Sequence, residues 1–281
     1  MKTLSFFTFC VILQWVRIMR RLTKEYEIGK GAIHSSRKNY SRECSVHSHE
    51  FFEIEYFSAG HGEHIMDGVR SEIKEGMLYF MTPLNFHSFN AEDCVIYNTM
   101  FSEKICNTAF LLGLIRNNEG LSIRLEGEDK IFVEALLSEL CEHHKNEEYA
   151  SFLLNAVLCK LALIKNCNDA EMSTLSRALV YLIEHFRENP TLNDTAAYAG
   201  FTPTYFSALF KKEINIGFKE YVDRLRFEYA KKLLEHTDKT VMQVCSESGF
   251  DDYPNFVRRF KKRYGVAPGS MKKQNVQNKI L

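Results

Sequence analysis

The chain has 281 residues, of which 45% are hydrophobic and 13% aromatic, and it carries 36 basic and 36 acidic side chains. This length fits two domains better than one, and the apolar content excludes intrinsic disorder as the main state. Only 5 prolines and 14 glycines exclude collagen-like and proline-rich chains. The zero net charge is unevenly distributed, because residues 173–281 hold 18 basic against 12 acidic groups. A C-terminal part that binds a polyanion is the first inference.

Residues 1–18 differ in character from the rest of the chain. They form a short apolar run between Lys2 and Arg17, with fewer apolar residues than the 20 or so that span a bilayer. No small-x-small cleavage site follows, which disfavours a signal peptide. We interpret this segment as an apolar extension produced by a mis-called translation start, with a membrane anchor as the alternative.

The eight cysteines include no CxxC pair, so neither a thioredoxin-type redox motif nor a zinc knuckle is supported. Scattered cysteines in apolar surroundings are typical of core side chains in a reducing compartment. A cytoplasmic location, with no membrane contact, is the expectation.

Residues 26–101 show the pattern of short β-strands. Alternation places Phe52, Ile54 and Tyr56 on one face of a strand, and Asp67-Gly68 is a two-residue hairpin signal. Many short strands with turn residues between them predict a small antiparallel barrel or sandwich. Two further strands are expected at Met77–Met81 and Cys94–Phe101.

From Glu103 the hydrophobic period becomes helical. One helix is expected over Glu128–His144 and a second over Phe152–Ile164, while the polar residues 166–173 suit a linker. The two helices either form a dimer surface or only cover the barrel. Their expected apolar faces are Ile131, Ala135, Leu136 and Leu140 in the first helix, and Leu153, Ala156, Val157 and Leu161 in the second.

The C-terminal region contains the same plan twice. After a helix capped by Ser173, with Leu175, Leu179, Leu182 and Phe186 on its apolar face, a short helix from Leu192 runs to the turn Gly200-Phe201. Thr202 then caps a new helix with Pro203 in its first turn. The second copy has a short helix over Val241–Ser248, the turn Gly249-Phe250, and a helix that we expect Asp251 to cap. Such a repeat predicts two helix-turn-helix units, each with a helix suited to a DNA major groove.

The segment between the two units sets their separation. Phe218–Leu234 is expected to be one helix of 17 residues, or about 26 Å long. With the widths of the flanking helices added, the two recognition helices would lie about 34 Å apart, which is one turn of B-DNA. They could therefore enter consecutive major grooves of double-stranded DNA.

Spacing separates the two faces of each recognition helix. Phe206, Leu209 and Phe210 belong to the core in the first, and Phe256 and Phe260 in the second. Arg258 and Asn255 suit bidentate contacts with bases, whereas the lysines suit phosphates, although a plain solvated face is the alternative. The residues predicted to contact DNA are Thr204, Tyr205, Ser207, Ala208, Lys211, Lys212, Tyr253, Asn255, Arg258, Arg259 and Lys262.

Residues 173–272 resemble the DNA-binding domain of AraC/XylS-type bacterial transcription regulators. Asn215 stands where the family usually has Gly, but Asn also tolerates the left-handed conformation. Pro254 stands where a small polar residue is commoner. The residues that carry the resemblance are Ala196, Gly200, Phe201, Tyr205, Phe206, Phe210, Lys211, Phe218, Tyr221, Arg226, Ala230, Leu233, Leu234, Val241, Val244, Gly249, Phe250, Phe256, Phe260, Lys261, Lys262, Gly265 and Pro268.

This resemblance implies an α+β protein with an N-terminal cupin-like β-barrel, a helical connector and a C-terminal all-α double helix-turn-helix domain. The expected boundaries are residues 1–18 for the extension, 19–102 for the effector-sensing barrel, 103–172 for the connector and dimerisation region, and 173–281 for the DNA-binding domain. It also implies a homodimer, a small-molecule effector such as a carbohydrate, and contact with RNA polymerase if the protein is an activator.

Four residues of the barrel region resemble the cupin metal motif: His47, His49, Glu53 and His87. We expect them to line a site for a small-molecule effector, with no cofactor, and two alternatives stay open. Three histidines and one glutamate can bind iron, manganese or zinc, but Ser41 replaces the expected Gly and His87 follows Pro83 one residue too early. The histidines can also be purely structural.

The leading hypothesis is a ligand-responsive, sequence-specific DNA-binding transcription regulator without enzymatic activity. A metal-dependent cupin enzyme with a DNA-binding module is one rival, which leaves the duplicated basic helices unexplained. A ligand-independent architectural DNA binder is the other.

Overall fold

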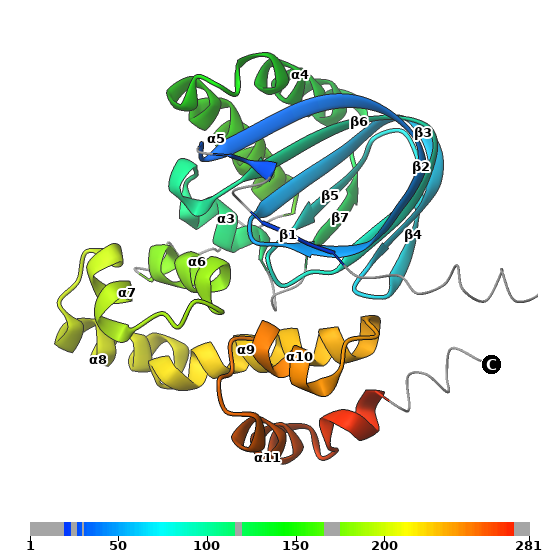
Figure 1. Cartoon of the computed structure of the whole chain (residues 1–281). Coiled ribbons are helices and arrows are strands. Elements are labelled where there is room, and N and C mark those ends of the chain that lie inside the picture. Colours follow the sequence, from blue (N-terminus) through cyan, green and yellow to red (C-terminus); the bar gives the residue numbers. More distant parts are fainter. Residues whose placement is uncertain (1–19, 24–26, 30, 116–119, 166–174, 273–281) are drawn as a thin grey trace, which may run out of the picture.

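The computed structural model of the chain describes residues 20–23, 27–29, 31–115, 120–165 and 175–272. It has a β-barrel with helices on one side, and a C-terminal helical part that lies against one end of the barrel (Figure 1). The predicted α+β class is thereby confirmed. The predicted N-terminal extension, the linker over residues 166–173 and the Ser173 cap lie outside the described residues.

The barrel is one mixed sheet in the order β1-β2-β6-β3-β5-β7, with β4 paired to β3. β1 runs parallel to β2 and the other pairings are antiparallel. The strands are β1 (Arg20–Leu22), β2 (Ile33–His49), β3 (Phe52–Met66), β4 (Val69–Ile73), β5 (Met77–Met81), β6 (His87–Phe101) and β7 (Leu121–Arg124).

The predicted hairpin is present, with Asp67 at φ 49° and Gly68 at φ 82°, the left-handed conformation that an Asp-Gly turn permits. The strand Met77–Met81 is confirmed as β5. The last predicted strand starts at His87 rather than Cys94, because residues 87–92 also pair with the long strands β2 and β3.

Residues 103–164 contain more than the predicted helices. A 3-10 turn η1 (Glu103–Ile105) and the helix α3 (Thr108–Leu114) precede β7, which pairs with β5 and so extends the sheet. The two predicted helices are α4 (Gly127–His143) and α5 (Glu147–Ile164). The second begins at Glu147 rather than at Phe152, because Asn146 caps it by accepting a hydrogen bond from the backbone N–H of Tyr149.

The apolar face predicted for α4 was wrong at Ile131 and Ala135, which are exposed, and right at Leu140. Val133, Leu137 and Leu140 are buried, whereas Ile131 is 70% exposed. The helix carries apolar residues on two sides, and packing against the sheet selects the side that contains Val133. The face predicted for α5 holds better, since Leu153, Val157 and Leu161 are buried.

The C-terminal helices follow the predicted plan, and the linking helix α9 has 19 residues. One cap was wrong: Asp252, not Asp251, accepts a hydrogen bond from the backbone N–H of Asn255. Thr202 occupies its predicted N-cap position without a side-chain bond. The helices are α6 (Ser176–His185), α7 (Leu192–Ala199), α8 (Pro203–Ile214), α9 (Phe218–His236), α10 (Val241–Glu247) and α11 (Tyr253–Tyr264).

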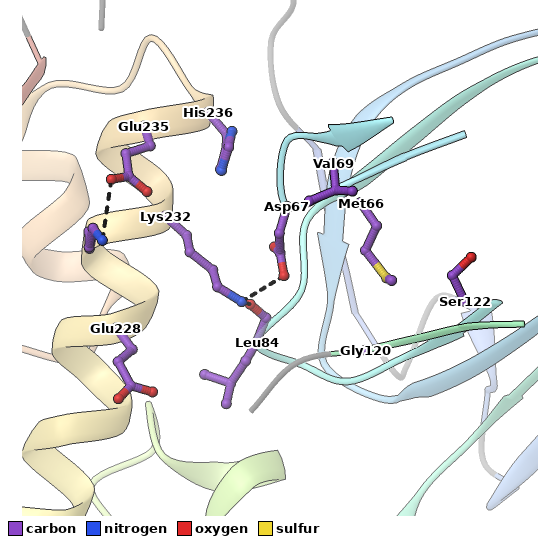
Figure 2. A pocket seen from close by; sticks show the side chains of 11 residues that line it. Met66, Asp67, Val69, Leu84, Gly120, Ser122, Glu228, Lys232, Glu235 and His236 are labelled. Atoms are coloured by element: carbon purple, nitrogen blue, oxygen red, sulfur yellow. Dashed lines mark hydrogen bonds and ion pairs between the residues drawn. The ribbon is translucent and has the colours of Figure 1, made fainter. Parts of the chain in front are cut away.

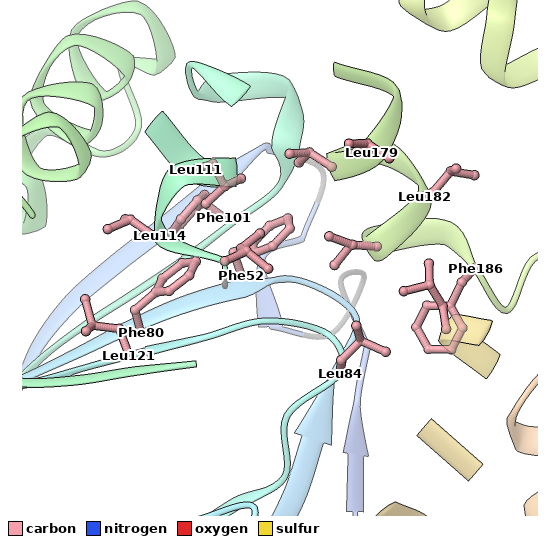
Figure 3. Close-up of a cluster of buried hydrophobic side chains, with 14 of the residues drawn as sticks. Phe52, Phe80, Leu84, Phe101, Leu111, Leu114, Leu121, Leu179, Leu182 and Phe186 are labelled. Carbon is pink, nitrogen blue, oxygen red and sulfur yellow. The ribbon is translucent and has the colours of Figure 1, made fainter. Parts of the chain in front are cut away.

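A continuous hydrophobic core connects the barrel with the C-terminal helices (Figure 3). Phe52, Phe80 and Phe101 on the outer face of the sheet pack against α3, and the same cluster continues to Leu179 and Phe186 around α6. The two parts are therefore packed against each other rather than merely tethered.

Candidate functional site

Two helix-turn-helix units stand at the two ends of α9: α7 with α8, and α10 with α11 (Figure 1). Each turn contains a glycine in the left-handed region, Gly200 at φ 82° and Gly249 at φ 81°. A Cβ at Gly249 would lie 2.9 Å from the backbone oxygen of Arg187, so the second turn has no room for a side chain. Asn215 ends α8 in the predicted left-handed conformation, at φ 62°.

The core positions predicted for the recognition helices are buried at all four phenylalanines, whereas Leu209 is half-buried. Phe206 and Phe210 of α8 and Phe256 and Phe260 of α11 are fully buried. Of the residues predicted to contact DNA, Asn255 and Arg259 are half-buried. The exposed ones are Thr204, Tyr205, Ser207, Ala208, Lys211, Lys212, Tyr253, Arg258 and Lys262.

The polar side chains of α11 differ in what they contact. Arg258 donates from Nη2 to Asn255 Oδ1 at 3.0 Å, which holds the two side chains together on the exposed face. The guanidinium of Arg259 instead pairs with Asp223 of α9 and lies 5.2 Å from the ring centroid of Phe227. Arg258 and Asn255 are thus better placed than Arg259 to reach a base.

Positive charge collects in the last turn of both recognition helices. Lys211 and Lys212 end α8, and Lys261, Lys262 and Arg263 end α11. Cations in this position are favoured by the helix dipole. The same side chains are suited to the phosphates that flank a major groove.

The structure brings the four predicted barrel residues into one buried cluster. His47 and His49 end β2, Glu53 lies at the start of β3, and His87 begins β6, where it pairs in register with His47. Their exposed fractions are 7%, 0%, 3% and 1%. We call this group the His47 site.

The nitrogen and oxygen atoms of the His47 site converge. His49 Nε2 lies 2.8 Å from Glu53 Oε2 and 3.1 Å from His87 Nε2, which is itself 3.4 Å from Glu53 Oε2. The Nδ1 atoms of His47 and His49 lie 2.9 Å and 3.1 Å from the backbone oxygens of Ser45 and Phe51. Those contacts leave the Nε2 atoms of both rings available to a ligand.

The protonation states of the side chains in the His47 site favour the binding of a cation. Burial lowers the pKa of His47 to about 3 and that of His87 to about 4, so both rings are neutral at pH 7. Burial alone would raise the pKa of Glu53, but the neighbouring His49 and His87 hold that pKa well below its usual range. Neutral imidazoles and an ionised carboxylate are the forms that bind metals.

Sequence reasoning missed three residues beside this site: Glu55, His64 and Asn98. Asn98 Nδ2 donates to Glu53 Oε1 at 2.8 Å and lies 3.5 Å from Glu55 Oε1, so one amide holds both carboxylates. The available signal was Glu55, two residues after Glu53 and hence on the same strand face. His64 and Asn98 join them only through the pairing of β3 with β6.

A cavity of about 230 Å³ inside the barrel adjoins the cluster. His47, Glu53 and Glu55 form part of its wall together with Cys44 and Asn98. This volume is smaller than a typical drug-sized pocket but holds several water molecules or a small polar ligand.

The barrel contacts α9 through residues that adjoin the His47 site in sequence. Ser48 Oγ lies 3.2 Å from the hydroxyl of Tyr229, and the Phe86 and Tyr229 ring centroids are 5.2 Å apart. Arg187 Nη1 donates to the same hydroxyl at 2.9 Å. Tyr229 is fully buried and lies in the helix that joins the two helix-turn-helix units.

A second contact lies at the edge of a cleft of about 470 Å³ between the barrel and α9 (Figure 2). Lys232 Nζ reaches across to Asp67 Oδ2 at 2.8 Å and to the backbone oxygen of Leu84 at 2.9 Å. Asp67 also accepts hydrogen bonds from Asn85 Nδ2 and from the backbone N–H of Phe86. The turn after β3, the loop before β6 and α9 therefore meet at one carboxylate.

Comparison with known proteins agrees with this geometry. Residues 195–274 match a family model described as "Helix-turn-helix domain". The chain is 36% identical over 107 residues to the uncharacterized HTH-type transcriptional regulator YtdP of Bacillus subtilis, covering 38% of this chain and 14% of YtdP. It is 34% identical over 106 residues to the regulatory protein PocR of Salmonella typhimurium, covering 38% of this chain and 35% of PocR.

These two matches span about a seventh and a third of those relatives. A longer match, 24% identical over 243 residues, covers 83% of this chain and 88% of the HTH-type transcriptional activator RhaR of Mannheimia succiniciproducens. Among solved structures, an AraC-type regulator from Chromobacterium violaceum is 25% identical with a TM-score of 0.35, covering 37% of this chain and 93% of that one. ToxT of Vibrio cholerae is 13% identical with a TM-score of 0.36, covering 86% of this chain and 97% of ToxT.

The fold and the matched segment define a protein with a tandem helix-turn-helix DNA-binding domain. For this segment, the AraC-type helix-turn-helix domain predicted from the sequence is confirmed. No helix in the described part of the chain is long and apolar enough to cross a membrane.

Proposed function

We propose that this chain is a sequence-specific, DNA-binding transcription regulator whose DNA affinity depends on a ligand in the barrel. The observation that carries this proposal is the placement of two helix-turn-helix units on one rigid helix, each with an exposed and basic recognition helix. Arg258 and Asn255 would read bases, and the lysines at the ends of α8 and α11 would bind phosphates.

The ligand would bind at the His47 site. Three ligand atoms that lie 2.8–3.4 Å apart, all buried, fit a first-row divalent transition metal, and His47 supplies a fourth ligand. Such an ion would supply positive charge next to the buried and ionised carboxylate of Glu53. The adjacent cavity supports the other candidate, a small polar effector such as a carbohydrate, on its own or beside the ion.

The remaining partners follow the family resemblance. A homodimer would form through the exposed apolar side chains of α4 and α5, which include Ile131, Phe132 and Phe152. RNA polymerase would be a partner if the protein activates transcription.

A metal-dependent enzyme is the weaker candidate for the function, because catalysis in the barrel would leave the tandem helix-turn-helix domain without a role.

Selection of genomic DNA fragments by the full chain, at near-physiological salt, tests the proposal. We expect enrichment of a few promoter fragments that carry two half-sites about one helical turn apart. The double variant Arg258→Ala/Lys262→Ala serves as the control and should enrich none of them. Equal recovery of all fragments by the parent chain, with and without added ZnCl₂ or cell extract, would contradict sequence-specific regulation.

Replacing Tyr229 should weaken the link between the barrel and the DNA-binding domain. Tyr229→Phe removes the hydroxyl that contacts Ser48 and Arg187 but keeps the ring between Phe86 and Phe186. Each such hydrogen bond is worth about 0.5–1.5 kcal/mol, so the ratio of DNA affinities with and without zinc should change about 2- to 10-fold.

Fluorescence anisotropy on a selected operator, with zinc-loaded and EDTA-treated protein, measures that ratio. Tyr149→Phe on α5 is the matched control, because its hydroxyl donates to Glu139 of α4, on the barrel side of the molecule. Equal ratios in the parent and in Tyr229→Phe would remove Tyr229 from the coupling.

A further inference from the structure

A second cluster of possible ligands shares one residue with the His47 site. His87 directs Nε2 toward His49 and Glu53, and its opposite ring nitrogen, Nδ1, lies 3.4 Å from His64 Nε2 and 3.7 Å from Glu55 Oε2. His64 Nε2 and Glu55 Oε2 are 3.5 Å apart. We call Glu55, His64 and the Nδ1 side of His87 the His64 site.

These three distances are long for hydrogen bonds and short enough for shared metal ligation. All of them exceed the 2.7–3.2 Å or so of a good hydrogen bond that involves nitrogen. A point equidistant from three atoms spaced in this way lies about 2 Å from each, which is the length of a zinc–nitrogen or zinc–carboxylate bond. The atoms are therefore placed as ligands around a common centre.

The His64 site is closed and only partly satisfied by the protein. His64 is 0% exposed and Glu55 is 3% exposed. Glu55 Oε2 and His64 Nδ1 have no hydrogen-bond partner among the described residues. Buried polar atoms without partners are costly, and a bound cation would remove that cost at the carboxylate.

The surrounding side chains fix the orientation of these ligands. The ring of Tyr79 stacks on His64 with centroids 3.8 Å apart, and Ser71 Oγ lies 2.9 Å from the Tyr79 hydroxyl. Asn98 holds Oε1 of both glutamates, which leaves both Oε2 atoms directed at the histidines. A preorganised ligand set of this kind binds with little loss of side-chain entropy.

We propose that the His64 site is a second transition-metal site, so that the barrel holds two divalent ions bridged by the imidazole of His87. The first ion is the one proposed for the His47 site, and this inference rests on that proposal. The bridging ring would release its remaining N–H proton to solvent, because each of its nitrogens then donates an electron pair to one ion. Two divalent ions would carry four positive charges against the three negative charges of Glu53, Glu55 and the bridging imidazolate, so the two sites together would hold one net positive charge.

Metal stoichiometry tests this inference. The full chain is stripped with EDTA, loaded with ZnCl₂, freed of excess zinc by gel filtration and analysed by mass spectrometry for zinc per chain. We expect two ions in the parent chain, and one in His64→Gln and in Glu55→Gln. His143→Gln is the matched control, since it removes an exposed histidine beside Glu139 and Glu142 and should leave the count at two.

Loading with Cu²⁺ gives a readout that protein folding alone would not change. Two copper ions on one imidazole should show magnetic coupling in the electron paramagnetic resonance spectrum, and His64→Gln should show an isolated ion. Circular dichroism confirms that each variant is folded.

A parent chain with one ion, unchanged by His64→Gln but lost in His49→Gln, would overturn the second site and leave the first. A parent chain with no ion would overturn both, while the DNA selection would still test the regulator itself.

Discussion

Phe227→Ala should destabilise the protein by about 3–5 kcal/mol, the usual cost of removing a buried phenylalanine. Phe227 lies on α9 with 3% of its surface exposed. Its ring contacts those of Phe250, Phe256 and Phe260, with centroid distances of 4.6, 5.9 and 6.2 Å. The Phe227 ring therefore packs the second recognition helix, α11, against α9, the helix that joins the two helix-turn-helix units.

Urea unfolding of the full chain, followed by circular dichroism, measures this change. Val69→Ala is the matched control, because Val69 is 71% exposed and should change the free energy of unfolding by less than about 0.5 kcal/mol. Phe227→Leu, which refills most of the space, should recover part of the loss. A loss below about 1 kcal/mol in Phe227→Ala would show that α11 does not depend on this ring.

The C-terminal part was predictable because its signals are local. Gly200 and Gly249 need the left-handed conformation, Pro203 fits only the first turn of a helix, and the phenylalanines recur at helical spacing. Each of these constraints acts within a few residues, so the sequence alone determines where the helices begin, end and bury their side chains. The exchange of Asp251 for Asp252 as the cap shows the limit, since two adjacent aspartates satisfy the same local rule.

The barrel was less predictable because its site depends on strand pairing. The motif residues His47, His49 and Glu53 are close in sequence, but His64 and Asn98 approach them only through the register of β3 with β6. Likewise, α4 has apolar residues on two sides, and only the sheet it packs on selects Val133 over Ile131. Long-range contacts determine the composition of the site and the buried face of α4, and neither can be read from the hydrophobic periodicity of the sequence.

The same long-range contacts suggest why ligand state and DNA binding belong together. Ser48 lies between His47 and His49, which are proposed ligands, and Phe86 immediately precedes His87. Ser48 and Phe86 both contact Tyr229 of α9. A change of a few tenths of an ångström at the ligands would thus act on the helix that sets the separation of the two recognition helices. Barrel and DNA would then be linked thermodynamically, each changing the affinity of the other.

Arg258→Ala should lower the affinity for a selected operator by about 1–3 kcal/mol, or about 5- to 150-fold, and should relax the preference at one base position. Its guanidinium is exposed on α11 and is held by Asn255 Oδ1, which orders it for a bidentate contact with a guanine. Binding to operators mutated at each position measures the effect.

Lys262→Ala is the comparison that separates base reading from charge. Lys262 is exposed in the last turn of α11, so its loss should weaken binding to all operators alike and lower the slope of log affinity against log salt by about 1. Arg258→Ala should instead change the ranking of the operators at constant salt. If both variants weaken every operator equally, α11 binds only the backbone, and sequence must be read by α8 or by the shape of the DNA.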